Sequence, residues 1–306
     1  MQHVPKEQDR FKRHHLEELT GKTFAYVSIA ILLVALVAIT YFIASKGLST
    51  FFKNDVNLFN FLFGTEWSPE GDMGKPSFGA FPFIFGSFAV TVLAALISAP
   101  LGIGAAIFMN EIAPAWGQKV LQPVIELLVG IPSVVYGFVG LSLVVPFMRE
   151  RFEGVGFGLA SGMVVLSVMI LPTITSVALD SLKALPIKLK EASFALGATR
   201  WQTISKVLVP AALPGLLTGV VLGMTRAFGE ALAVQMVIGN SQKLPESLFD
   251  STSTLTSVLT LEMGNTIAGS AHSNALWSLA LILLVMSFVF ILLIRFLGRR
   301  GQTHER

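Results

Sequence analysis

The sequence predicts an all-α, polytopic membrane protein with six transmembrane helices. Of its 306 residues, 53% are hydrophobic and only 13% are charged, and its mean hydropathy is +0.70. A soluble domain normally carries about twice that charged fraction. The apolar runs are roughly 20 residues long, enough to cross a hydrocarbon core of about 30 Å. They do not alternate between apolar and polar residues as barrel strands do, so we expect helices.

Apolar runs and polar segments divide the chain into an N-terminal cytoplasmic tail, 1–22, and a transmembrane domain, 23–306. The first apolar run exceeds the roughly 7–15 residues of a signal-peptide core, and we therefore expect an uncleaved span. This span and the periplasmic segment after it, about 45–80, are interpreted as an addition to a five-helix core at about 81–296. A short cytoplasmic tail, 297–306, follows. The expected spans are approximately 24–44, 81–109, 120–147, 157–179, 211–238 and 276–296.

Positive charge indicates the orientation, because cytoplasmic segments of membrane proteins are enriched in Lys and Arg. Fifteen of the 22 Lys and Arg residues lie on the side that holds both tails, Lys119 and the segment 180–210, and six lie on the other side. Both termini are therefore expected in the cytoplasm, and the segments 45–80 and 239–275 outside. Arg226 is the one cation inside a predicted span.

The segment 180–210 contains the signals of two short helices. Pro186 suits the first turn of a helix, and Gly197 can adopt the left-handed conformation that ends one, so a helix is expected at 187–196. Thr199-Arg200-Trp201-Gln202 has the spacing of a capping box and opens a second short helix. We expect the two helices to lie at an angle across the cytoplasmic surface.

The same segment offers two kinds of side chain to a binding partner. Small residues allow a close approach, and apolar anchors dominate interface energies. An alternative, on the residues alone, is an amphipathic elbow that rests on lipid headgroups. The small residues are Ala192, Ser193, Ala195 and Ala198, and the anchors are Phe194, Leu196 and Trp201.

The fifth span, entered at Pro210, contains two charged residues, Arg226 and Glu230. Their spacing of four residues predicts that they share a helix face. A charge at the centre of a bilayer helix costs on the order of 3 kcal/mol, so such residues usually face a protein interior or a water-filled path. The planar, permanently charged guanidinium suits phosphate oxygens, and Glu230 could hold it in place. An anion path and a structural ion pair are both open on this chemistry.

Small residues recur every four positions on the neighbouring face of the fifth span. This spacing predicts a ridge against which another helix packs closely. The charges would then lie at the edge of a protein-packed face. The ridge consists of Gly215, Gly219, Gly223, Ala227 and Ala231.

The third span contains residues that can bend or thin a helix, although glycine is common in membrane helices. Tyr136, in the same span, is interpreted as a packed aromatic residue, with a hydroxyl donated to a ligand as the alternative. The bending residues are Gly130, Pro132, Gly137 and Gly140.

The segment around Glu191 resembles the EAA loop of ABC-transporter permeases. In that loop, Glu-Ala-Ala is followed after three residues by Gly and, nine residues later, by Ile-x-Leu-Pro. Residues 191–193, Gly197 and 207–210 keep this spacing, with substitutions at Ser193, Val207 and Val209. In that family the loop sits in a groove on a separate ATPase subunit. The resemblance therefore implies ATPase coupling through Glu191, Ala192, Phe194, Leu196, Gly197 and Trp201.

Further segments resemble the phosphate-specific permeases of the PstC type. The resemblance implies a multi-pass subunit of a bacterial or archaeal inner membrane that forms half of a path for inorganic phosphate. Its implied partners are a second, PstA-like permease, two PstB-like ATPase subunits, an external PstS-like phosphate-binding protein and membrane lipid. It also assigns Arg226 and Glu230 to the substrate path. The matching segments are 63–69, 78–82, 126–137, 226–231 and 238–240.

The residues give no indication of chemistry performed by this chain. Gly21-Lys22-Thr23 resembles the end of a nucleotide-binding P-loop, but Leu16 stands where that motif requires its first glycine. There is no cysteine, and the histidines are not spaced as metal ligands. We expect no enzyme, no metal site and no bound cofactor, with ATP and Mg²⁺ on the partner ATPase. Nothing indicates nucleic-acid binding.

The favoured function is the permease subunit of an ATP-driven phosphate importer. Two alternatives are a permease for another oxyanion and a non-transporting membrane scaffold or sensor that uses the 180–210 segment to hold a partner. An ion-coupled carrier is disfavoured, because such carriers show broken helices in matching halves of the chain and no such match is found.

Overall fold

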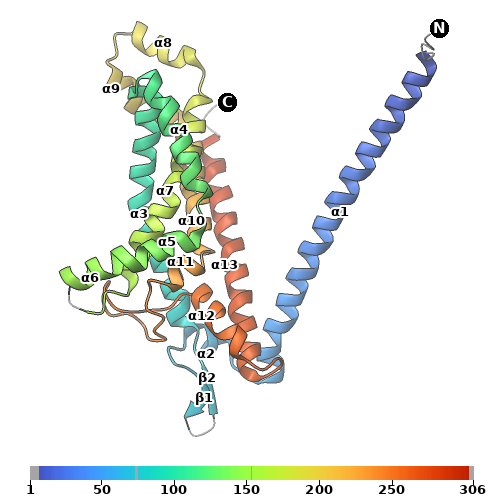
Figure 1. The fold of residues 1–306 in the computed structure, drawn as a ribbon, viewed down its shortest axis with the longest axis vertical. Helices are drawn as coiled ribbons and strands as arrows, with labels where there is room; N and C mark the ends of the chain where they lie inside the picture. The colour runs from blue at the N-terminus through green and yellow to red at the C-terminus, as the bar shows by residue number, and fades with distance from the viewer. Residues whose placement is uncertain (1–6, 73–74, 153, 303–306) are drawn as a thin grey trace.

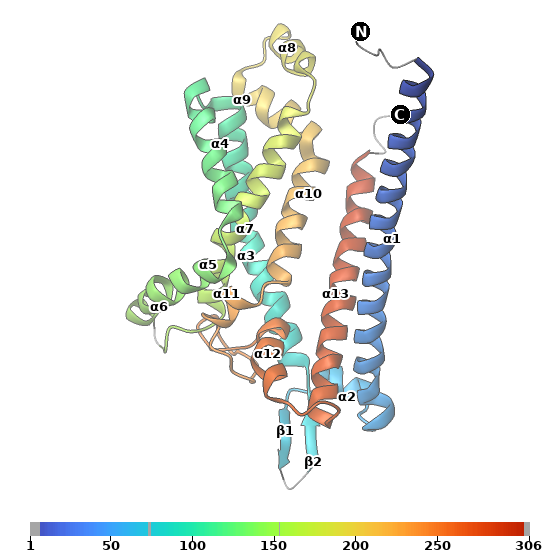
Figure 2. The ribbon, with the colours of Figure 1, turned by 45° about the vertical axis from the view of Figure 1, so that its right-hand side comes forward.

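The structure, a computed structural model, describes residues 7–72, 75–152 and 154–302. Long helices run lengthwise, with α8 and α9 at one end and a β-hairpin at the other (Figures 1 and 2). We call these the α8 end and the hairpin end. The elements are α1 (Glu7–Lys53), α2 (Leu58–Phe63), β1 (Trp67–Asp72), β2 (Lys75–Phe78), α3 (Phe81–Ile107), η1 (Phe108–Ile112), α4 (Ala115–Gly130), α5 (Ser133–Val139), η2 (Gly140–Val144), α6 (Val145–Arg151), α7 (Leu159–Lys183), α8 (Ile187–Ala195), α9 (Arg200–Thr203), η3 (Ile204–Leu208), α10 (Val209–Phe228), α11 (Leu232–Gln235), α12 (Leu255–Glu262), η4 (Met263–Asn265) and α13 (Ala271–Gln302).

Within the described residues, six helices are long and apolar enough to cross a membrane, which confirms the predicted number. Helix α1 extends the first expected span in both directions, from the polar tail to Lys53. Residues 1–6 and 303–306 of the two predicted tails lie outside the described part of the chain. The six candidate spans are Gly21–Lys53, Phe81–Ile112, Ser133–Arg151, Leu159–Lys183, Arg200–Phe228 and Ala271–Leu292.

Helix α7 is the most buried of these spans, and α3 and α10 pack against it. The predicted small-residue ridge lies on the α7 side of α10: a Cβ on Gly215 would come within 2.3 Å of Ser181 Oγ, and one on Gly223 within 2.7 Å of Ile174 Cγ1. The absence of side chains thus lets the two helices approach closely. Ala231, the fifth expected member, lies beyond the end of α10.

The third expected span, 120–147, is not one helix. It is interrupted at Ile131 and Pro132, which separate α4 from α5. Ile131 is extended (φ −66°, ψ 130°), as the residue before a proline prefers to be, because its helical conformation would clash with the proline ring. The break leaves the last carbonyl groups of α4 without the donors of a regular helix; the Leu128 carbonyl oxygen retains only a long bond, 3.4 Å, from the backbone N–H of Ile131.

Both predicted bounds of the fifth span, 211–238, differ from those of the structure. A continuous helical segment runs from Arg200 to Phe228, through the wide π turn η3 and past Pro210. Proline ends a regular helix because it lacks an N–H and crowds the carbonyl four residues earlier. The π turn just before Pro210 changes that bonding pattern, and the helix continues. The helix ends instead at Gly229, so Glu230 lies outside it.

Aromatic side chains build the core of the hairpin end. Trp67 and Phe78 of the hairpin pack with Phe61 of α2 and Phe83 of α3, and all four are buried. Glu262, at the end of α12, accepts hydrogen bonds from Trp67 Nε1 (3.2 Å) and Gln242 Nε2 (2.9 Å), and its Oε2 lies 2.8 Å from His272 Nε2. One carboxylate therefore connects the hairpin, the loop after α11 and the start of α13.

Helix α1 slants away from the bundle toward its N-terminal end (Figure 1). Its contacts concentrate near its other end, where the Ser278 hydroxyl of α13 lies 2.6 Å from the Gly47 carbonyl oxygen and 2.7 Å from Thr50 Oγ1. The apolar stretch of α1 is otherwise exposed on all sides. It must be covered by lipid or by another protein.

Adding a methyl group at Gly86 should destabilise the fold. A Cβ on Gly86, in α3, would lie 2.2 Å from the Ser253 carbonyl oxygen, which is backbone and cannot move aside cheaply. We expect Gly86→Ala to cost about 1–3 kcal/mol, as overpacking does, and to lower the thermal midpoint of the purified protein. Gly104→Ala, on the same helix with open space around it, is the control. Equal midpoints for the two variants would contradict this packing.

Candidate functional site

Arg226 extends from the last turn of α10 toward two other helices. Its Nη1 donates to Thr173 Oγ1 (2.9 Å), near the middle of α7, and its Nη2 lies 3.4 Å from the carbonyl oxygen of Val129, near the end of α4. The guanidinium is thus fixed between α4, α7 and α10, beside the middle of α7.

The break between α4 and α5 provides the acceptors in this region. Tyr136 OH, from α5, donates to the Leu128 carbonyl oxygen (2.8 Å), and Arg226 reaches the carbonyl oxygen of Val129. Free carbonyl groups carry the negative end of the helix dipole, which favours a nearby cation. The guanidinium of Arg226 therefore lies next to the helix break at Pro132.

Arg226 and Glu230 do not form the ion pair that their spacing suggested. Within the described residues Arg226 has no carboxylate within ion-pair distance. The Glu230 carboxylate instead accepts the backbone N–H of Ala233 (3.1 Å) at the start of α11, and the Glu230 carbonyl oxygen accepts from Thr256 Oγ1 (2.7 Å). The prediction of a shared helix face was wrong because α10 ends between the two residues.

The charge and geometry of Arg226 suit an anion. A guanidinium has five N–H donors in a fixed planar fork and stays protonated at any working pH. In the described part of the chain only two contacts use those donors, one of them long at 3.4 Å. Donors remain for a bound oxyanion, and no side-chain carboxylate among residues 7–72, 75–152 and 154–302 pairs with them.

The α8–α9 segment has the predicted helix ends. Thr199 and Gln202 form both bonds of the capping box, and Gly197 is left-handed with φ +79°. Pro186 precedes the first residue of α8 as its cap rather than standing inside the first turn. The segment stands at one end of the molecule (Figure 2). Two short helices at an angle are therefore confirmed, although the second continues into α10.

Apolar side chains project from this segment. Leu196 is 89% exposed, Trp201 69% and Phe194 43%, and Glu191 and Ala192 are also exposed. Such anchors at one end of a bundle form a surface suited to a protein partner. We call these residues, with Gly197, the α8–α9 surface.

Ser193 differs from its expected role of allowing close approach to a partner. It is buried, and its hydroxyl lies 2.9 Å from the hydroxyl of Thr203. The bond joins α8 to the end of α9. Ser193 therefore holds the angle between the two helices instead of facing outward.

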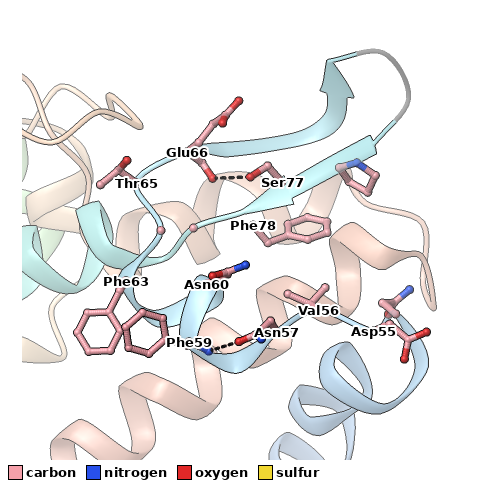
Figure 3. A pocket seen from close by; sticks show the side chains of 14 residues that line it. Asp55, Val56, Asn57, Phe59, Asn60, Phe63, Thr65, Glu66, Ser77 and Phe78 are labelled. Atoms are coloured by element: carbon pink, nitrogen blue, oxygen red, sulfur yellow. Dashed lines mark hydrogen bonds between the residues drawn. The ribbon is translucent and has the colours of Figure 1, made fainter.

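The hairpin end contains a pocket of about 560 Å³ between α2 and the hairpin. Asn60 and Phe78 project into it from α2 and β2 (Figure 3). Glu66 and Asp55 also line it, and the Ser77 hydroxyl donates to the Glu66 carbonyl oxygen at 3.3 Å. The pocket is open and mostly polar, and it lies at the opposite end of the molecule from the α8–α9 surface.

Sequence reasoning missed two groups that hold Arg226. Thr173 is one of many hydroxyl residues in the spans, and no local signal distinguishes it. The Val129 carbonyl oxygen could have been found, because Pro132 predicts a break that frees carbonyl groups just before it.

The family of this chain follows from its sequence. Residues 98–302 match the family described as the binding-protein-dependent transport system inner membrane component, and the chain belongs to that family. It is therefore a multi-pass inner-membrane permease subunit of a binding-protein-dependent ABC transporter, a class of protein that has no catalytic activity of its own.

Two named relatives cover nearly the whole chain, and a third covers half of it. It is 60% identical to the probable ABC transporter permease protein YqgH of Bacillus subtilis, over 95% of this chain and 94% of that one. It is 33% identical to the phosphate transport system permease protein PstC of Pasteurella multocida, over 98% and 97% of the two chains. A second Bacillus subtilis protein, the probable ABC transporter permease protein YqgI, is 39% identical over 51% of this chain and 52% of its own.

Solved structures support the fold. A bacterial alginate ABC transporter, in complex with a periplasmic protein bound to an alginate pentasaccharide, matches 93% of this chain and 96% of its own chain. The TM-score is 0.64 and the sequence identity is 16%. This likeness confirms the predicted importer-permease fold.

Removing the Thr173 hydroxyl should loosen Arg226. Thr173→Val keeps the shape but removes the acceptor of a charge-assisted hydrogen bond, worth about 1.5–3 kcal/mol. We expect a lower thermal midpoint for the purified protein. Thr218→Val is the matched control, because the exposed Thr218 hydroxyl donates only to the Pro214 carbonyl oxygen of its own helix. If Thr218→Val lowered the midpoint as much, the assigned contact would be refuted.

Proposed function

We propose that this chain is a permease subunit of an ATP-driven importer of inorganic phosphate, forming half of the translocation path. The observation that carries the proposal is Arg226, a cation fixed beside the middle of α7 without a carboxylate partner among the described residues. The likeness to the phosphate transport system permease protein PstC, over nearly the whole chain, supports phosphate as the anion.

The proposed orientation places the α8 end in the cytoplasm. The excess of Lys and Arg in segments that meet this end supports it, because positive residues are retained on the cytoplasmic side. Both termini then lie inside and the hairpin end faces outward. This orientation puts the α8–α9 surface where a cytoplasmic ATPase can reach it.

We propose three protein partners for this subunit. Two copies of a separate ATPase would hold ATP and Mg²⁺, and one would bind the α8–α9 surface. An external phosphate-binding protein would dock at the hairpin end, where the pocket between α2 and the hairpin lies (Figure 3). A second, homologous permease would complete the path; the two Bacillus subtilis permeases that resemble this chain support such a pair.

In the proposed mechanism, Arg226 serves as a transient anion site. Closure of the ATPase pair moves the α8–α9 surface, and the continuous helix from Arg200 to Phe228 carries that movement to the guanidinium. Released phosphate exchanges hydration for the free N–H donors. Glu230 contributes by holding the turn between α10 and α11, which keeps Arg226 at the end of its helix.

Replacing Arg226 should abolish most transport without dissolving the complex. Loss of a charge-assisted bidentate contact should reduce ATP-driven phosphate uptake by about 10- to 100-fold in Arg226→Gln, and less in Arg226→Lys, which keeps the charge but not the fork. Uptake is measured in proteoliposomes that contain the purified complex. Arg151→Gln, an exposed arginine on α6, is the control.

The same preparations separate the two possible roles of Arg226. Normal uptake by Arg226→Gln would refute the anion site. Loss of the partner subunits during purification would favour a structural role in bundle packing instead.

The α8–α9 surface should account for ATPase binding. Trp201→Ala and Leu196→Ala remove exposed apolar anchors, each worth at least about 2 kcal/mol when it is a hot spot, so affinity should fall roughly 30-fold or more. Retention of the ATPase during affinity purification of the permease measures this. Phe24→Ala, equally exposed but on α1, should retain it. Undiminished retention by both surface variants would contradict the assignment.

A permease for another oxyanion is the competing function. A single cation in a path selects anions but not one particular anion, and the relative at 60% identity carries no substrate in its name. Uptake of labelled phosphate in the presence of excess sulfate decides between the two. Suppression by sulfate would favour the competing function.

A further inference from the structure

We propose that the Glu111–Lys190 ion pair is a second coupling route, which carries movement of the α8–α9 surface into α3; this inference rests on the proposed function. Glu111 Oε2 accepts from Lys190 Nζ at 2.6 Å, and Asn110 Nδ2 donates to Glu111 Oε1 at 2.8 Å. The Glu111 side chain is only 5% exposed, whereas that of Lys190 is 30% exposed. A buried carboxylate with one cationic partner is strongly bound to it, because separation would leave an uncompensated buried charge.

The pair joins two elements that have no other polar contact within the described residues. Lys190 lies on α8, and Glu111 lies in the π turn η1 at the end of α3. Single π turns are irregular points in helices and are frequent at functional positions. Gln118 Nε2 donates to the Met109 carbonyl oxygen (2.7 Å), so the π turn is also linked to α4. Any displacement of α8 must therefore either move η1 or break the ion pair.

Space beside the pair permits such a displacement. A cavity of about 230 Å³ adjoins Glu111 and Lys190 and is lined on its other sides by Leu185, Ile187 and Leu208. Leu208 belongs to the π turn η3, through which α9 continues into α10. Residues of both π turns, η1 and η3, thus line one cavity next to α8, and both turns lead into long helices.

The far end of α3 connects to the hairpin end. Helix α3 is 27 residues long, about 40 Å at 1.5 Å per residue. Near its start, Ser87 Oγ accepts the backbone N–H of Leu255 (2.8 Å), the first residue of α12. A rigid shift of α3 would be transmitted to α12. The last residue of α12, Glu262, accepts hydrogen bonds from Trp67 of the hairpin and Gln242 of the loop after α11. The first route, through α10, ends at Arg226; the second reaches the outer surface.

The inference assigns a positioning role to Glu111 and Lys190, with no contact to substrate. Breaking the pair should leave ATPase binding and ATP hydrolysis in place but reduce the phosphate transported per ATP hydrolysed. Residues that carry coupling between sites change it by modest factors, and we expect a fall on the order of tenfold. A purely structural pair would lower yield or stability and leave this ratio unchanged.

The experiment measures ATP-driven phosphate uptake and ATP hydrolysis together, in proteoliposomes holding the complete complex with its loaded binding protein. The variants are Glu111→Gln, Lys190→Gln and the exchange of both residues, Glu111→Lys with Lys190→Glu. Lys188→Gln, an exposed lysine on the same helix, is the control. We expect both single variants to lower transport per ATP and the exchange to restore at least part of it.

Two results would overturn the inference. One is an unchanged ratio in both single variants; the other is a lowered ratio that the Lys188 control shares. If Glu111→Gln does not assemble, Lys190→Gln decides, because Lys190 is the more exposed partner. Failure of the proposed function is distinguishable, since the wild-type complex itself would then show no ATP-driven phosphate uptake.

Discussion

The structure depends on one constraint of the membrane interior: a backbone polar group away from water needs a partner within the protein. The break between α4 and α5 creates such groups between the helices, and side chains from two other positions donate to them. Tyr136 donates a hydrogen bond to the Leu128 carbonyl oxygen, and Arg226 donates one to that of Val129. The guanidinium of Arg226 is tolerated here because the broken helix offers it a carbonyl oxygen, and that carbonyl oxygen gains a donor from the guanidinium. An oxyanion that approached this point would meet N–H donors already held in place.

Prolines give the long helices their irregular turns. Each of the three π turns in the described part of the chain ends two residues before a proline: η1 before Pro114, η2 before Pro146 and η3 before Pro210. A proline lacks an N–H and crowds the preceding turn, which a wider turn relieves. After η2 and η3 the chain remains helical, whereas after η1 it leaves the helix. The prolines therefore mark points of adjustable geometry, two of which border α8.

Features set by neighbouring residues could be predicted from the sequence. Apolar length predicted the six spans, and the Thr199–Gln202 spacing and Gly197 predicted the ends of α8 and α9. Features that depend on where a helix ends could not be predicted from the sequence. Four-residue spacing predicts a shared face only if the helix continues, and α10 stops between Arg226 and Glu230. The ion pair of Glu111 with Lys190 joins residues far apart in the chain, and no local pattern reveals it.

The exposed apolar surface of helix α1 limits how specifically this helix can bind another membrane protein. Hydrogen bonds from α13 hold it near Gly47 and Thr50, and its apolar stretch at 24–41 presents exposed side chains in every direction. In lipid, exchanging acyl chains for another helix yields little hydrophobic gain, so association there relies on close fit between surfaces. A stretch that is apolar on every side presents no particular face for such a fit. Specific contact with another membrane protein would therefore have to come from the bundle.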